Sequence, residues 1–101
     1  MVTIMGDRIE SLRRMQVRVT GEVQGVCFRM VACQQARQLQ LTGLVRNCVD
    51  GSVEIVAEGE VWELGQLVAW CHQGSPMSEV TGVEEFYGDP TSEFSGFDIA
   101  F

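Results

Sequence analysis

The sequence predicts a single α+β domain in which two helices cover one face of an antiparallel sheet. Three observations predict this fold class. The spacing of apolar residues changes from two to about 3.6 after residue 27, an Asp-Gly pair at residues 50–51 separates two strand-like runs, and a second helical run ends at Gly74-Ser75-Pro76. A length of 101 residues with 46% hydrophobic residues is that of one ordinary globular domain.

The first strand and the first helix are predicted from their apolar periods. Residues 15–20 alternate between apolar and polar side chains, which is typical of a half-buried strand. From Phe28 onward apolar residues recur at helical spacing, so a helix is expected to end near Gln40 or Leu41. We expect residues 1–14 to be an N-terminal extension, either ordered or disordered, and residues 15–101 to be the domain.

The remaining elements follow from the same patterns. Residues 44–49 and 52–57 form a predicted hairpin, with a type I′ turn that needs positive φ at both Asp50 and Gly51. A second helix with an apolar face follows at 61–71, and then strands at 80–87 and 94–101. This β-α-β-β-α-β order with a last strand predicts a ferredoxin-like sandwich, with both helices on one face of the sheet.

Charge and composition exclude several classes of function. Seven basic against fourteen acidic residues give a net charge of −7, which argues against a nucleic-acid partner. No apolar run is long enough to cross a membrane, and residues 1–15 do not resemble a secretory signal. Four scattered cysteines and one histidine predict no Cys/His metal cluster, and the cysteines are expected to be thiols in a reducing cytoplasm.

The turn from the first strand into the first helix predicts an anion site. Gly21 and Gly25 bracket a short loop whose backbone N–H groups can point into one concavity, at the positive end of the helix that begins near Phe28. Arg29 adds a fork of donors suited to two phosphate oxygens. The pattern alone leaves a second interpretation open, in which the glycines only shape the turn and Arg29 is a solvated surface residue.

Two segments resemble the signatures of the acylphosphatase family. Residues 21–29 (GEVQGVCFR) resemble the family's loop signature, and residues 41–54 (LTGLVRNCVDGSVE) resemble its second signature. The resemblance extends from about Met15 to the C-terminus. It implies that Arg29 and the backbone amides of Gln24, Gly25, Val26, Cys27 and Phe28 hold a phosphoryl group. It also implies that Asn47 orients the attacking water.

The activity implied by the resemblance is hydrolysis of a small-molecule acyl phosphate or a phosphorylated carboxylate, without metal or cofactor. The lack of a candidate histidine base or metal cluster agrees with it, because an acyl phosphate expels a carboxylate that needs no general acid. The alternative is a ferredoxin-like module that binds phosphate without turnover. A water-positioning Asn47 favours the hydrolase. We expect a monomer by default.

Cys27 is the one loop residue whose side chain has two interpretations. In the first, only its backbone N–H matters. In the second, a thiol at a positive helix end beside Arg29 has a lowered pKa and is sensitive to oxidation.

Overall fold

The alternating residues at the start of the domain form strand β1 (Leu12–Glu22), in a computed structural model that describes residues 11–101. Met15, Val17 and Val19 are fully buried, and the residues between them are exposed. The strand is longer at both ends than predicted, so Leu12–Arg14 of the expected extension lie in it. The first ten residues of that expected extension lie outside the described residues.

Two helices form where the period of apolar residues changes. Helix α2 (Phe28–Gln38) buries Phe28, Ala32, Cys33 and Ala36, and helix α3 (Val61–Gln73) buries Leu64, Leu67, Val68 and Cys71. Helix α2 stops two residues before the predicted end because Gln40 adopts a left-handed conformation, with φ 60°. The N–H of Leu41 donates to the carbonyl of Ala36 at 3.0 Å, which closes a Schellman motif with glutamine in the place that glycine prefers.

The predicted hairpin is confirmed, but its turn type is wrong. Strands β2 (Thr42–Asn47) and β3 (Val53–Glu60) are antiparallel neighbours. Of the two turn residues only Gly51 has positive φ, 95°. The N–H of Gly51 donates to the carbonyl of Cys48 at 3.1 Å, and the N–H of Cys48 donates to that of Ser52 at 2.8 Å. This is a three-residue loop, a type I turn followed by a left-handed glycine.

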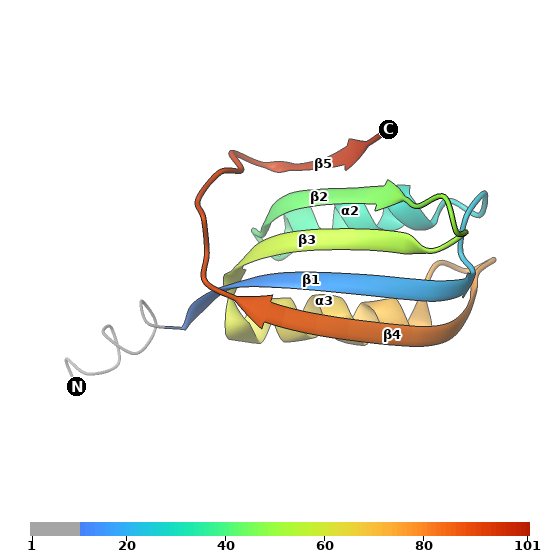
Figure 1. The fold of residues 1–101 in the computed structure, drawn as a ribbon, viewed down its shortest axis with the longest axis horizontal. Coiled ribbons are helices and arrows are strands. Elements are labelled where there is room, and N and C mark those ends of the chain that lie inside the picture. The colour runs from blue at the N-terminus through green and yellow to red at the C-terminus, as the bar shows by residue number, and fades with distance from the viewer. Residues whose placement is uncertain (1–10) are drawn as a thin grey trace.

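The sheet has five strands in the order β4-β1-β3-β2-β5, completed by β4 (Glu79–Gly88) and β5 (Phe97–Ala100). All neighbours are antiparallel except β5, which runs parallel to β2. Both helices lie behind the sheet as drawn in Figure 1, and the core lies between the two layers. The predicted ferredoxin-like arrangement is confirmed, with the parallel β5 as an addition to the antiparallel sheet.

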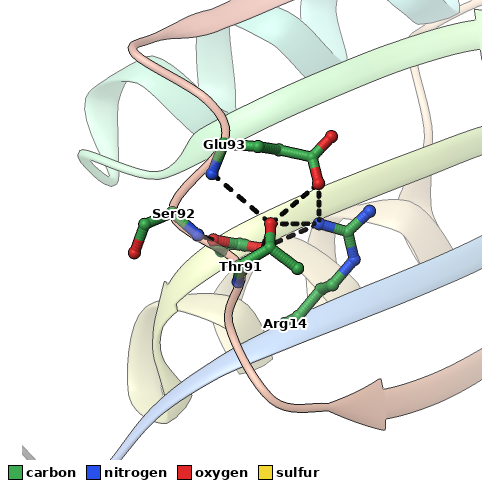
Figure 2. A network of polar contacts seen from close by, with 5 residues as sticks. Arg14, Thr91, Ser92 and Glu93 are labelled. Atoms are coloured by element: carbon green, nitrogen blue, oxygen red, sulfur yellow. Dashed lines mark hydrogen bonds and ion pairs between the residues drawn. The ribbon is translucent and has the colours of Figure 1, made fainter.

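A buried carboxylate fixes the connection between β4 and β5 (Figure 2). Glu58 is 6% exposed and accepts hydrogen bonds from Arg14 Nη1, from the N–H and hydroxyl of Thr91, each at 2.8 Å, and from the N–H of Ser92 at 2.9 Å. Burial raises the pKa of Glu58, but these donors outweigh it and lower that pKa to about 2. The Glu58 cluster, which Glu93 joins by accepting from Arg14 Nη1, thus holds the segment that leads into β5.

Candidate active site

The loop between β1 and α2 presents unpaired backbone donors. Gly25 and Cys27 both have positive φ, 77° and 62°, and Cys27 is the N-cap of α2. No hydrogen bond among residues 11–101 uses the backbone N–H groups of Gln24 through Phe28. The first turn of α2 holds no acidic residue that would neutralise the positive end of the helix. The loop therefore offers a concentration of donors to an anion.

The loop is anchored on two opposite sides. The side-chain amide of Gln24 donates to the carbonyls of Cys48 and Ser52, both at 2.8 Å, which ties the loop to the turn of the β2–β3 hairpin. On the other side the hydroxyl of Ser75, beyond the end of α3, donates to the carbonyl of Val26 at 2.9 Å. The loop conformation is thus fixed by residues distant in sequence, before any ligand binds.

A cleft of about 200 Å³ lies at this loop. Its walls come from the loop, the start of α2, the end of β2 and the end of the chain. The lining residues are Val23, Gly25, Cys27, Phe28, Arg29, Met30, Asn47, Ile99 and Phe101. The volume is several times the ~30 Å³ that a water molecule occupies in the liquid, so an anion and a water fit together.

Arg29 is the charged member of the cleft. Four other arginines, at positions 14, 18, 37 and 46, are paired with carboxylates. Arg29 has no ion pair among the described residues; its Nη1 donates to the carbonyl of Ala100 at 3.5 Å, and its guanidinium lies 5.1 Å from the centre of the Phe101 ring. In a chain of net charge −7, this guanidinium remains available to an anionic ligand.

Asn47, the last residue of β2, brings an unpaired amide to the same cleft. Its Oδ1 is buried and has no hydrogen-bond partner among the residues that the structure describes. Two other buried side-chain atoms of residues 11–101 share this condition, Arg13 Nε and Glu63 Oε1, and neither residue lines the cleft. A buried amide oxygen left without a partner costs roughly 1–3 kcal/mol, so Oδ1 of Asn47 is suited to accept a hydrogen bond from a ligand or water in the cleft.

Comparison with known proteins decides the family. The acylphosphatase family model matches residues 15–99, which is most of the chain. The chain belongs to the acylphosphatase family. The resemblance of residues 21–29 and 41–54 to the family's signatures is thereby supported over nearly the whole described chain.

Individual acylphosphatases agree with the assignment. The chain is 44% identical to an acylphosphatase of Anaeromyxobacter dehalogenans, over 96% of this chain and 100% of that protein. It is 50% identical to one of Pelotomaculum thermopropionicum, over 90% and 99%. The crystal structure of acylphosphatase from Bacillus subtilis superposes with a TM-score of 0.85 at 35% identity, covering 88% of this chain and 99% of that one. These relatives support acyl phosphate hydrolysis, and no observation favours phosphate binding without turnover.

The acylphosphatase fold brings together most of the residues singled out in the sequence. Arg29, Asn47, Gly25, Cys27 and Phe28 line one cleft. Gln24 and Val26 do not line it, although their amides belong to the same loop. The thiol of Cys27 is exposed, and its sensitivity to oxidation stays a prediction.

Sequence reasoning missed several contributions to the cleft, including the lining residues Val23 and Met30. The side chain of Gln24 anchors the loop to the hairpin, and nothing local in the sequence identifies its two distant acceptors. Ile99 and Phe101 line the cleft from the end of the chain. Their alternation with buried Phe97 was a usable signal, because residues two apart on a strand face the same side.

Two features are absent from residues 11–101, a candidate metal site and a helix that could span a membrane. No group of three or more histidine, cysteine, aspartate or glutamate side chains is placed to hold a metal ion in this part of the chain. Neither of the two described helices is long and apolar enough to cross a membrane.

Proposed function

We propose that this chain hydrolyses acyl phosphates at the cleft between the β1–α2 loop and Asn47. The observation that carries the proposal is the meeting, in one cleft, of Arg29, which has no carboxylate partner within residues 11–101, and of Asn47, whose buried Oδ1 has no partner among those residues either. Membership of the acylphosphatase family and the names of its relatives supply the reaction.

The phosphoryl group of the substrate binds at the start of α2. Its oxygens accept hydrogen bonds from the backbone N–H groups of Gln24 through Phe28 and from the guanidinium of Arg29. These donors are fixed before the substrate arrives, so they need no reorganisation as charge spreads over the phosphoryl oxygens in the transition state.

Asn47 positions the nucleophilic water. A side-chain amide can donate to a water and accept from it, but it is too weak a base to remove a proton. The water oxygen forms a bond to phosphorus while the bond to the acyl oxygen breaks, and that electron pair leaves with the carboxylate. One proton of the water passes to a phosphoryl oxygen, which gives a carboxylate and dihydrogen phosphate.

Hydrolysis of an acyl phosphate requires few catalytic groups from the protein. A carboxylate is a stable leaving group, so no general acid is needed, and positioning with electrostatic stabilisation is sufficient. We propose that the enzyme works without metal or cofactor, as a cytoplasmic monomer acting on a small-molecule acyl phosphate or a phosphorylated carboxylate.

The decisive experiment measures phosphate release from benzoyl phosphate in EDTA. We expect turnover by the wild type, and loss of at least about 10³-fold in Arg29→Ala together with loss of affinity for inorganic phosphate. Arg37→Ala is the matched control, because Arg37 also lies on α2 and donates to a β5 carbonyl, that of Phe97 at 2.8 Å. An equal loss in Arg37→Ala would mean that Arg29 acts only by holding β5. A metal requirement, or activity that survives Arg29→Ala, would end the proposal.

A further inference from the structure

A second hollow adjoins the cleft along the β1–α2 loop. Its lining residues are Gly25, Val26, Cys27, Pro76 and Met77, and its volume is about 370 Å³. None of them is charged, and Met77 is 79% exposed. Gly25 and Cys27 line both this hollow and the cleft, so a ligand bound at the loop can extend from one into the other.

The two hollows lie toward opposite anchors of the loop. The side chain of Gln24 ties one side of the loop to Cys48, the neighbour of Asn47 in the chain. Val26 is tied on the other side to Ser75, two residues before Met77. The residue proposed to position the water therefore stands on the hairpin side, and Met77 stands on the side beyond α3.

In-line displacement at phosphorus determines which part of the substrate faces Met77. The attacking and leaving oxygens lie roughly in line, on opposite sides of the transferring group. A water that approaches from Asn47 leaves the acyl oxygen directed away from the hairpin. Gly25 and Cys27, which line both hollows, connect the cleft with Pro76 and Met77 on the side of the loop away from Cys48.

We propose that this second hollow is the subsite for the acyl group, and that it favours apolar acyl groups of about the size of benzoyl over acetyl and carbamoyl groups. The proposal rests on the proposed function, since it assumes that the phosphoryl group occupies the cleft. Met77 is suited to the role because its unbranched, polarisable thioether adapts to apolar partners of different shape. The uncharged lining offers no partner to an ionised acyl chain, and the net charge of −7 opposes one.

The test compares two exposed methionines on the two sides of the loop. Met77→Gln removes the apolar contact at nearly constant volume, and Met30→Gln makes the same change beside Arg29, where Met30 is 49% exposed. The readout is the ratio of kcat/KM for benzoyl phosphate to that for acetyl phosphate, in which the intrinsic reactivities of the substrates cancel between variants. We expect Met77→Gln to lower this ratio by about fivefold to tenfold, Met77→Leu to restore it, and Met30→Gln to change it by less than about twofold.

Binding of phosphonate analogues separates this proposal from the proposed function. Phenacylphosphonate and acetonylphosphonate replace the reacting oxygen by a methylene group and are not hydrolysed. Calorimetry should show tighter binding of phenacylphosphonate to the wild type, with the preference lost in Met77→Gln. That result supports the subsite even if no acyl phosphate is turned over, in which case only the proposed function fails.

Turnover with an unchanged ratio in Met77→Gln would overturn the subsite while leaving the proposed function intact. A ratio that falls in Met30→Gln instead would place the acyl group beside Arg29, which also overturns it. Equal affinity of the wild type for the two phosphonates would do the same.

Discussion

The two ends of the β2–β3 hairpin hold buried polar groups in opposite states. At one end Glu58, opposite Thr42 in the register, accepts four hydrogen bonds. At the other end Asn47, opposite Val53, has a buried oxygen with no partner in the described part of the chain, and the loop amides at the same cleft have none there either. These ends lie at opposite sides of the sheet in Figure 1.

The difference distinguishes buried polar groups that stabilise the fold from buried polar groups that are available to a ligand. A buried carboxylate is tolerated where every lone pair is matched, and there it stabilises the fold. Groups left unmatched reduce stability, and at the cleft a bound ligand can supply the missing partner. Substitutions at the loop end should therefore change activity more than stability, and substitutions at the Glu58 end should do the reverse.

Among substitutions on the β2–β3 hairpin, removing the Asn47 side chain is expected to give the largest effect. Asn47→Ala should lower kcat for benzoyl phosphate by about 10²–10³-fold, because one preorganised polar group at the reacting atoms is lost. Affinity for inorganic phosphate should stay within about threefold, and the free energy of unfolding in urea should be unchanged or higher. A variant that loses stability and activity in parallel would show that Asn47 is structural.

Glu58→Gln tests the opposite end. We expect a loss of about 2–3 kcal/mol in the free energy of unfolding at pH 7, because hydrogen bonds to a charged acceptor are replaced by bonds to a neutral one. Under conditions in which the variant is folded, its kcat/KM should stay within about threefold of the wild-type value. If the free energy of unfolding is unchanged, the Glu58 cluster contributes little to stability. The two ends of the hairpin would then not differ in their contribution to folding.

The pH dependence of stability follows from the same carboxylate. The pKa of Glu58 in the fold, about 2, lies below its ordinary value of 4.5, so its stabilisation is complete above about pH 4.5 and is lost as pH falls toward 2. Urea unfolding from pH 6 to pH 2.5 should show a smaller decline in Glu58→Gln than in the wild type. Some decline should remain, since hydrogen bonds from Ser52, with the charge of Arg18, hold the pKa of Asp50 at about 2 as well.

The smallest effects are expected at two non-glycine residues that both adopt a left-handed backbone conformation. Cys27 at the loop end and Gln40 near the Glu58 end have φ values of 62° and 60°. Glycine at either position should raise the free energy of unfolding by about 0.5–1 kcal/mol, the strain relieved less the chain entropy added. Gln40→Gly should leave kcat/KM unchanged, whereas Cys27→Gly should lower it about threefold by loosening the loop. Equal kinetics in both variants would mean that rigidity at Cys27 has no functional role.

The sequence predicted the parts of the fold that depend on local patterns. Alternation and helical spacing located β1 and α2, because each period reports one buried face. The turn at Asp50-Gly51 was misjudged because Oδ1 of Asp50 accepts from the N–H and hydroxyl of Ser52, at 3.0 and 2.6 Å, in a turn with only Gly51 left-handed. The parallel pairing of β5 with β2 joins residues about 54 apart and has no local signal.

The candidate site also has features that local sequence indicates and features that depend on the tertiary fold. The position of Arg29 beside a loop at a helix start was predictable, since a strand, a glycine loop and a helix follow one another in the chain, whereas its role stays a prediction. Asn47 came from the resemblance to a family and not from spacing, because its place beside Arg29 depends on the sheet. The Gln24 and Ser75 anchors, and with them the hollow at Met77, exist only once the hairpin and the segment after α3 reach the loop.

One measurement tests the central claim most directly, the titration of ¹⁵N-labelled protein with inorganic phosphate followed by amide chemical shifts. The account predicts saturable shifts concentrated at the backbone amides of residues 24–28 and at the Asn47 side-chain amide, and their loss in Arg29→Ala. Shifts that centre elsewhere, or that persist in Arg29→Ala, would contradict the account, since the unpaired donors of the loop would then not be the site of the phosphoryl group.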